Sequence, residues 1–318
     1  MLPIRRFHRH VQQRRQGQVP TISTSHPGRG CRSPSAALPL LALLMWAPSA
    51  AAAPTPGPLW QHDLAKVQAQ ARANGHFILV DLYAEWCGWC KTLERKVFST
   101  SDFQAFAAHF ELLRVDVEDG AVGSRMQGTY GVDSLPTLLI LDAGGIQVGA
   151  VSGYLPLAQF IEAVRQEVAR YEETLERFEQ LRAGGEPAAL RALAETLHRR
   201  RDGGRAAVLY DHLLALERPE PERLLLLTMA TDAQRLGGDL ARARKTAAMA
   251  HALAARLDQP ILAEQVELLE AQIAQDAGDC DHAEKSLKSF LSAHPQSPMR
   301  WQARDLLTAL HEQTTTCG

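Results

Sequence analysis

Four apolar runs of strand length lie in the first half of the chain. Residues 77–83 are apolar at six of seven positions, which is typical of a strand buried on both faces. Residues 110–117 form a second run. Residues 137–141 and 146–151 predict two more strands, joined by a hairpin because Asp-Ala-Gly-Gly lies between them. These runs predict the strands of one sheet.

Helical segments alternate with these strands. Residues 59–73 predict a first helix, and a second is expected to begin at a cysteine motif and to run through Arg95. A short helix around residues 121–127 and a longer one over residues 157–170 complete the set. The order of elements predicts an α/β domain over residues 59–170, with a mixed sheet and flanking helices.

Residues 171–318 contain no strand-like run and predict an all-α domain. This part is rich in Ala and Leu, and its glycine turns at Gly204, Gly238 and Gly278 are 34 and 40 residues apart. A period near 34 is typical of tetratricopeptide (TPR) repeats. The last unit resembles that family in its turn, a small residue and a closing proline: Gly278-Asp279, Ala283 and Pro295. We expect a TPR-like helical-repeat domain; a non-repetitive helical bundle is the alternative.

The N-terminal part has the pattern of a targeting segment. In residues 1–53, seven arginines precede an apolar run at residues 36–46, and small residues that offer a cleavage site follow at residues 49–53. The run is shorter than the roughly 20 residues that span a bilayer. We therefore expect a cleaved signal peptide and a periplasmic protein; an uncleaved membrane tether is the alternative. Residues 54–58, Pro-Thr-Pro-Gly-Pro, predict a stiff linker.

The charge of the chain is unevenly distributed. The full sequence has 34 basic and 36 acidic residues, but residues 1–52 hold seven arginines and no acidic residue. Without them, 27 basic and 36 acidic residues remain, a net charge of −9. Binding to nucleic acid needs clustered Lys and Arg. We expect no nucleic-acid partner.

Two of the five cysteines, Cys87 and Cys90, stand in the motif Trp-Cys-Gly-Trp-Cys. Disulfide exchange needs one thiolate that attacks and a second thiol that resolves the mixed disulfide, and this spacing at the start of a helix provides both. The helix N-terminus stabilises negative charge on Cys87. We therefore expect Cys87 to be the nucleophile, Cys90 to be the resolving thiol, and the two to form a redox-active disulfide.

A zinc half-site is the alternative for this pair. It would need a second pair of ligands, and the sequence has neither another cysteine pair nor suitably spaced histidines. We expect neither metal nor cofactor. Cys280 and Cys317 belong to no motif; in an oxidising compartment they could form a structural bridge.

The segment around the cysteines resembles the thioredoxin family. Val80-Asp81-Leu82-Tyr83-Ala84-Glu85-Trp86-Cys87-Gly88-Trp89-Cys90-Lys91 is similar to that family's active-site segment, and Ser134-Leu135-Pro136-Thr137-Leu138 to its cis-proline loop. The similarity covers about residues 59–168. Trp89 and the following Val97-Phe98-Ser99 resemble the C-terminal domain of the transmembrane electron transporter DsbD more than cytosolic thioredoxin.

The resemblance implies roles for residues outside the cysteine pair. Asp81 matches the buried acid that relays the proton of the resolving cysteine, although a structural strand-end Asp is the alternative. Pro136 is implied to be cis, which leaves the backbone of Leu135 free to pair with a substrate strand. The family carries a lysine near the acid where this chain has Leu112. Without that lysine, we expect desolvation to raise the pKa of Asp81 further.

The remaining residues near the motif divide into two groups. Trp86 and Trp89 are expected to form an apolar contact surface for a substrate, rather than core packing. The charged residues of the following helix are expected to form a solvated face and nothing more: Glu85, Lys91, Glu94 and Lys96.

Two functions of different classes are open. The first is a protein-disulfide reductase acting on protein thiols and disulfides, supplied by a membrane electron donor of the DsbD type, with the TPR-like helices binding a protein partner. The second is a chaperone-like adaptor in which the thioredoxin fold is only structural. The intact Cys87–Cys90 pair favours the enzyme.

Overall fold

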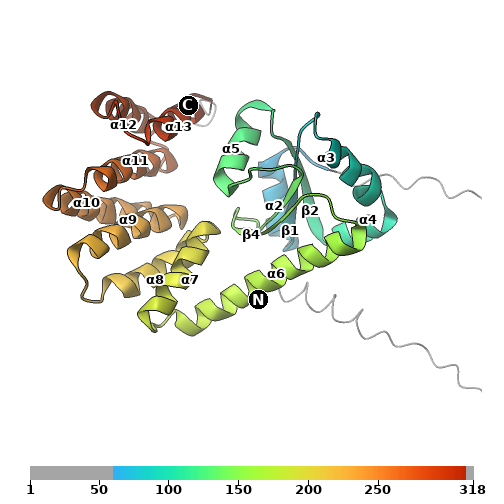
Figure 1. Cartoon of the computed structure of the whole chain (residues 1–318), viewed down its shortest axis with the longest axis horizontal. Coiled ribbons are helices and arrows are strands. Elements are labelled where there is room, and N and C mark those ends of the chain that lie inside the picture. Colours follow the sequence, from blue (N-terminus) through green and yellow to red (C-terminus); the bar gives the residue numbers. More distant parts are fainter. Residues whose placement is uncertain (1–59, 313–318) are drawn as a thin grey trace, which may run out of the picture. The chain divides into compact units, whose positions relative to one another are not determined.

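The structure is a computed structural model, in which residues 60–312 are described (Figure 1). The predicted signal segment and Pro-rich linker, and Cys317 at the other end, lie outside the described residues. The first part of the described chain contains these elements: α2 (Leu64–Asn74), β1 (Phe77–Tyr83), α3 (Gly88–Leu93), the π-helix η1 (Glu94–Phe98), α4 (Ser101–Ala107), β2 (Phe110–Asp116), α5 (Gly120–Tyr130), β3 (Thr137–Leu141), β4 (Gln147–Ser152) and α6 (Leu157–Leu181).

The four strands form one mixed sheet in the order β2-β1-β3-β4. Strand β1 runs parallel to β2 and antiparallel to β3, and β3 and β4 form the expected antiparallel hairpin. The predicted fold class, a mixed sheet with flanking helices followed by a helical part, is confirmed.

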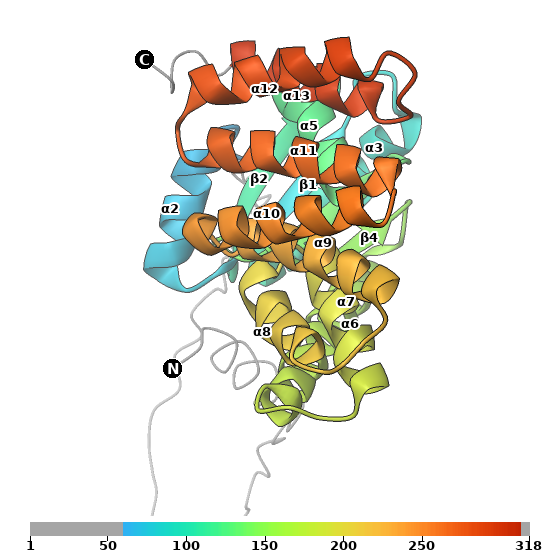
Figure 2. The ribbon, with the colours of Figure 1, turned by 90° about the vertical axis from the view of Figure 1, so that its left-hand side faces the viewer.

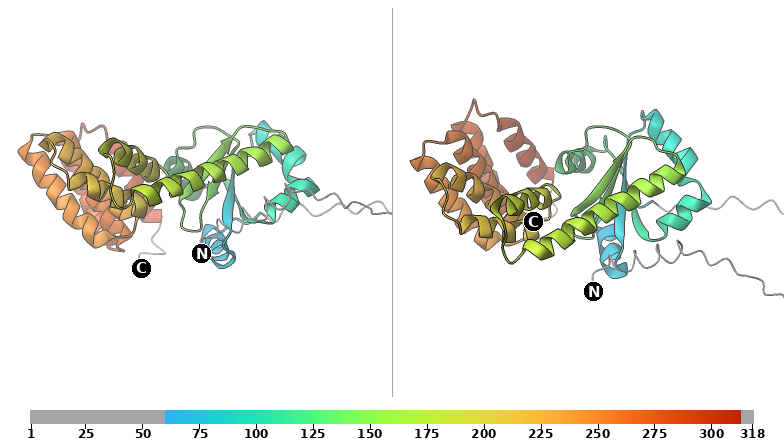
Figure 3. Two further views of the ribbon diagram at one scale, coloured as in Figure 1. Left: turned by 90° about the horizontal axis from the view of Figure 1, so that it is seen from below. Right: turned by 60° about the horizontal axis from the view of Figure 1, so that its bottom comes forward.

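Strand β1 lies between β2 and β3 in the sheet, and its side chains are buried on both faces. On one face, Ile78 and Val80 pack in a cluster with Val67 and Ala71 of α2. On the face crossed by α6 (Figure 3), the rings of Phe98, Phe103 and Phe160 lie within 4.8–6.1 Å of one another. An apolar strand of this kind is stable only between two covered faces.

Helix α6 is shared by the two parts of the structure. Near its N-terminus, Phe160 packs in the aromatic cluster beside the sheet, whereas Phe178 and Leu181 near its C-terminus belong to the core of the helical part. The helix is continuous from Leu157 to Leu181. The domain boundary proposed from sequence, between residues 170 and 171, therefore falls inside a helix.

The edge strand β4 is covered by the turn between α7 (Pro187–Arg199) and α8 (Gly203–Leu214). The Gln147 amide donates a hydrogen bond of 2.8 Å to the Arg200 carbonyl oxygen. The Arg200 guanidinium in turn donates to the carbonyl oxygens of Gln147 and Val148. These contacts satisfy backbone groups that an edge strand otherwise leaves open.

The rest of the described chain is helical (Figure 2). It contains α7 (Pro187–Arg199), α8 (Gly203–Leu214), α9 (Glu220–Leu236), α10 (Leu240–Arg256), α11 (Pro260–Asp276), α12 (Cys280–Ala293) and α13 (Arg300–Glu312). None of the helices in residues 60–312 has the length and apolarity needed to cross a membrane.

An aspartate begins every second helix of this part. The side chains of Asp202, Asp239 and Asp279 each accept a hydrogen bond from the backbone amide three residues on, which caps α8, α10 and α12. An alanine with no exposed surface follows four residues after each cap, at Ala206, Ala243 and Ala283. This recurrence agrees with a repeat of helix pairs, and the TPR-like assignment stays a prediction.

Helix α8 approaches the end of α9 so closely that only glycine fits at Gly203. A Cβ atom there would lie 2.5 Å from the Leu236 Cβ and would overlap the Ala233 carbonyl oxygen. At Gly204, the next residue of the same helix turn, a Cβ atom would have no neighbour within 4 Å. The two glycines are therefore a matched pair for mutation.

We expect Gly203→Ala to lower the free energy of unfolding by about 1–3 kcal/mol, because a backbone contact must open to admit the methyl group. Gly204→Ala should leave it unchanged or raise it by up to about 1 kcal/mol. Urea denaturation followed by far-ultraviolet circular dichroism measures both. Equal losses in the two variants would contradict the close approach.

Candidate active site

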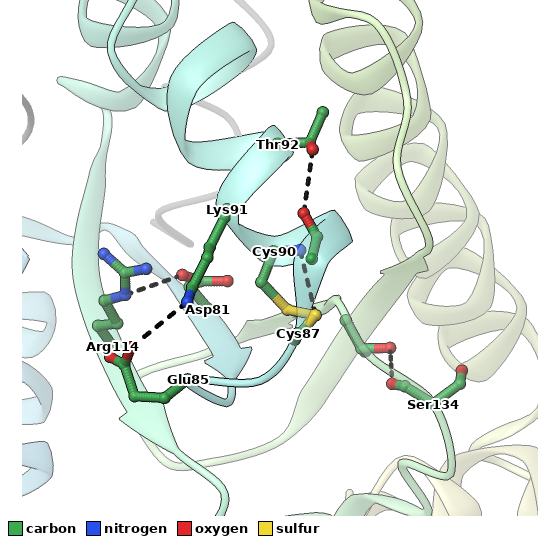
Figure 4. The surroundings of a disulfide bond; sticks show 10 residues. Asp81, Glu85, Cys87, Cys90, Lys91, Thr92, Arg114 and Ser134 are labelled. Carbon is green, nitrogen blue, oxygen red and sulfur yellow. Dashed lines mark hydrogen bonds and ion pairs between the residues drawn. A yellow bond between two sulfur atoms is a disulfide. The ribbon is translucent and has the colours of Figure 1, made fainter.

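The two motif cysteines lie at the start of α3 and form a disulfide (Figure 4). Cys87 is the N-cap residue of the helix, and its Sγ accepts a hydrogen bond of 3.1 Å from the Cys90 backbone amide. The Cα atoms are 5.3 Å apart. The short connection from β1 to α3 therefore delivers Cys87 to the helix end and holds Cys90 one turn inside it.

Burial does not distinguish the two sulfurs in this oxidised state, because each cysteine is 4% exposed. Their positions on the helix do distinguish them. The unpaired amides and the dipole at a helix N-terminus favour negative charge on the capping residue, and Cys87 is that residue. This geometry supports Cys87 as the attacking thiolate, which remains a prediction.

Asp81 lies in β1, fully covered, and faces a cation from the neighbouring strand. The sheet register pairs it with Arg114 of β2, and Arg114 Nε lies 3.2 Å from Asp81 Oδ2 as an ion pair. In Figure 4 the Asp81 carboxyl stands between Arg114 and the helix that carries Cys90. The other carboxyl oxygen, Oδ1, has no hydrogen-bond partner.

Burial raises the pKa of Asp81 to about 7; Arg114 opposes this rise, and Glu94 adds to it. A carboxyl group with that pKa can both accept and release a proton near neutral pH, as a proton relay requires. The role of Asp81 as the relay stays a prediction.

The expected rise in the pKa of Asp81 agrees with the structure, since burial is its largest cause. The loss of the family's lysine at Leu112 still leaves the acid with a cation, because Arg114 lies two residues further along the same strand. The expectation for Glu94 is wrong. Glu94 is not merely part of a solvated face, because its carboxylate forms an ion pair with the Arg114 guanidinium. Glu85 and Lys91 agree with the expected solvated face, because both side chains are exposed. Lys91 Nζ lies 3.8 Å from Glu85 Oε2.

Aromatic side chains surround the disulfide at the surface. Trp86 and Trp89 are 68% and 61% exposed, far too open for core residues. The Trp86 indole donates a hydrogen bond of 2.8 Å to Glu118, and the Trp89 ring stacks on Tyr154 with centroids 5.6 Å apart. Sequence reasoning missed Tyr154. The residue before it, Gly153, has a positive φ of 80°, and this turn was the local signal that could have drawn attention to the position. An exposed aromatic surface of this kind is suited to contact with a partner.

The Leu135–Pro136 peptide bond is cis, as the resemblance implied. The loop is fixed at its end by the Thr137 hydroxyl, which donates a hydrogen bond of 2.9 Å to the Ser134 carbonyl oxygen. Leu135 is half-buried against the core cluster that contains both cysteines. Within residues 60–312, no three or more His, Cys, Asp or Glu side chains are grouped so that they could hold a metal ion.

Comparisons with known proteins agree with this geometry. A family model described as "Thioredoxin-like" matches residues 59–143. The chain contains a thioredoxin-like domain. The thiol:disulfide interchange protein DsbD of Pseudomonas sp. (strain JR1 / K1) is 38% identical over 79 residues, which are 24% of this chain and 14% of DsbD.

Two further relatives resemble the same domain. DsbD of Yersinia pestis (strain Pestoides F) is 36% identical over 104 residues, 31% of this chain and 18% of that protein. The crystal structure of the Neisseria meningitidis DsbD C-terminal domain in the oxidised form covers 34% of this chain and 98% of its own, with 18% identity and a TM-score of 0.30. The matches to the DsbD proteins of Pseudomonas and Yersinia each span less than a fifth of the length of those proteins.

The pKa of Asp81 makes a prediction for the stability of the oxidised thioredoxin-like domain. The folded state holds a proton on Asp81 up to about pH 7, whereas the unfolded state loses it near the ordinary aspartate pKa of 3.8. The free energy of unfolding therefore falls as the pH rises through this window. Asp81→Asn, which removes the titration, should stabilise the protein by about 2–4 kcal/mol above pH 7 and by much less near pH 4.

Urea denaturation without reductant, at pH 4.5 and about pH 8, measures this difference. Asp102→Asn, which replaces an exposed acid in α4, is the matched control and should show no gain that grows with pH. A gain of equal size at both pH values for Asp81→Asn would contradict the raised pKa.

Proposed function

We propose that this chain is an exported thiol–disulfide oxidoreductase that reduces disulfides in proteins. The observation that carries the proposal is the closed Cys87–Cys90 disulfide at the N-terminus of α3, next to the exposed rings of Trp86 and Trp89. The similarity to thiol:disulfide interchange proteins supports it.

The exchange uses two steps. In the reduced protein the Cys87 thiolate attacks one sulfur of the substrate disulfide, and a mixed disulfide forms while the other substrate sulfur leaves as a thiolate. Cys90 then gives its proton to Asp81 and attacks the Cys87 sulfur. The bond from Cys87 to the substrate breaks, the second substrate thiolate leaves, and the Cys87–Cys90 disulfide closes. Two electrons pass from the protein to the substrate.

The local charges favour reduction over oxidation. A strong oxidant needs groups that stabilise the attacking thiolate, but Gly88 and Trp89 between the cysteines carry no charge. Two cations near the motif are already engaged, Lys91 by Glu85 and Arg114 by two carboxylates. The N-terminus of α3 then provides the stabilisation of the Cys87 thiolate, and this modest stabilisation makes the dithiol an electron donor.

The partners follow from the same proposal. A reductant in the periplasm needs electrons from across the membrane, and we propose a membrane donor of the DsbD type to supply them. The basic and apolar pattern of residues 1–53 supports export. The helical part is proposed to bind a protein partner, in addition to the exchange surface.

We expect Cys87→Ser to abolish exchange and Cys90→Ser to accumulate mixed disulfides with proteins, because no thiol then resolves them. Expression of Cys90→Ser in cells, with mass spectrometry of the trapped complexes, tests the roles of the two cysteines. Trapping by Cys87→Ser instead would reverse the roles. No insulin reduction by the unaltered protein would leave the adaptor as the function.

The same trapped chain tests export, because its N-terminus should lie near residue 53. An intact cytosolic chain would contradict export.

We expect the reduction potential of the Cys87–Cys90 pair to lie near that of thioredoxin, about −270 mV, rather than near that of the oxidant DsbA, about −120 mV. The reason is that Lys91 and Arg114 are paired with carboxylates and that Gly88 and Trp89 carry no charge. Equilibration with glutathione, with the redox state read from Trp fluorescence, measures this potential. A value near the oxidant would contradict the reducing direction and leave the exchange activity itself intact.

A further inference from the structure

Arg114 lies between two carboxylates of unequal exposure. Its guanidinium reaches Asp81, whose side chain is 2% exposed, and also pairs with Glu94, whose side chain is 43% exposed. The Arg114 side chain is itself only 19% exposed. The guanidinium lies over the Tyr83 ring, 4.2 Å from its centroid. Arg114 is thus held by contacts on three sides.

One positive charge therefore serves two negative groups. The contact with Glu94 uses Nη1, and the contact with Asp81 uses Nε at 3.2 Å without the alignment of a hydrogen bond. The part of the guanidinium that is engaged by Glu94 is not available to Asp81. Glu94 can hold this position because η1 begins at that residue, and a π-turn alters the direction of side chains relative to an α-helix.

Few other described groups act on Asp81. Besides Arg114 of β2 and Glu94 of η1, the charge interactions of Asp81 include Tyr83 at the end of its own strand. On the other side, β3 contributes the uncharged Leu138 as its paired residue. The cysteine helix contributes the thiol of Cys90 when the protein is reduced. The balance between Arg114 and Glu94 is therefore the main electrostatic influence from the surrounding elements.

We propose that Arg114 is a positioning residue for the resolving step, and that Glu94 opposes it by competing with Asp81 for the same guanidinium. The inference rests on the proposed function and deepens it. Arg114 favours the ionised form of Asp81, which can take the proton of Cys90, and Glu94 limits that effect. Together they set the pH at which the mixed disulfide is resolved.

Changes to the two residues should then act in opposite directions. Without Arg114, two carboxylates would face each other with no cation, and Asp81 would ionise only at higher pH. Without the charge of Glu94, the guanidinium would be free to serve Asp81 alone, and Asp81 would ionise at lower pH. A purely structural contact would be weakened by both changes in the same sense.

The experiment follows the two steps separately with dithiobis-nitrobenzoate as the disulfide substrate. The reduced full-length protein, with Cys31, Cys280 and Cys317 replaced by serine in every variant, releases the first coloured thiolate when Cys87 attacks. It releases the second when Cys90 resolves the mixed disulfide. Stopped-flow absorbance across a pH series gives a midpoint for the second phase. Asp81→Asn serves as the reference variant in which that midpoint should disappear.

Arg114→Gln should raise the midpoint by about one pH unit or more, and Glu94→Gln should lower it. Arg114→Lys keeps a positive charge and should remain near the unaltered protein. Arg95→Gln is the control. Arg95 is an exposed cation next to Glu94 in sequence, and its guanidinium donates a hydrogen bond to the Thr92 hydroxyl, so its removal should not move the midpoint. If Arg114→Gln does not fold, the downward shift in Glu94→Gln still decides the matter.

Midpoints that stay in place, or that move in the same direction in both variants, would overturn the inference but not the proposed function. Failure of the unaltered protein to release a second equivalent would overturn both. The second phase of the unaltered protein therefore separates the two failures: it is present when only the inference fails and absent when the proposed function fails as well.

Discussion

The constraint on which the site depends is a carboxyl group buried in the central strand of the sheet. A charge in that position is costly unless another charge accompanies it, and the partner must come from the adjacent strand in a fixed register. Asp81 and Arg114 are such a pair. A slip of one residue between β1 and β2 would turn Arg114 to the opposite face. The register of β1 and β2 thus determines which cation lies beside the buried carboxyl group of the site.

The same strand also determines where the cysteines lie. Strand β1 is buried along its length and ends at Tyr83. The chain therefore leaves the sheet at a fixed point and reaches Cys87, the cap of α3, four residues later. The reactive atoms thus stand on a rigid element, while the side chains of Trp86 and Trp89 are exposed to solvent. Rigid placement of the sulfurs and open apolar surface around them are the two properties that exchange with large substrates requires.

The sequence predicted the apolar elements and the cysteine motif well, because buried strands and helix starts are encoded by neighbouring residues. Prediction from the sequence failed where a residue's contacts lie on an element that is distant along the chain. Arg114 is one polar position in the run 110–117, and only strand pairing brings it opposite Asp81. Glu94 looked like a surface residue because its partner is 20 positions away. Tyr154 is near Trp89 only in the folded chain.

In the helical part, the sequence around Asp202 indicated the start of a helix only in part. Its aspartate and the alanine four residues later match the later caps, but two glycines between them predicted a break in the chain. The structure instead uses Gly203 inside the first turn of α8, where the end of α9 leaves no room for a side chain. Close packing between helices, which local sequence does not encode, explains the difference.

The continuity of α6 has a consequence for anyone who wishes to isolate the thioredoxin-like domain. Cutting the chain after residue 170 would halve a 25-residue helix and would remove Arg200, which covers the backbone of β4. The excised domain would carry an open sheet edge, and open edges invite association between copies. In the intact chain, the turn that carries Arg200 covers this edge of the sheet.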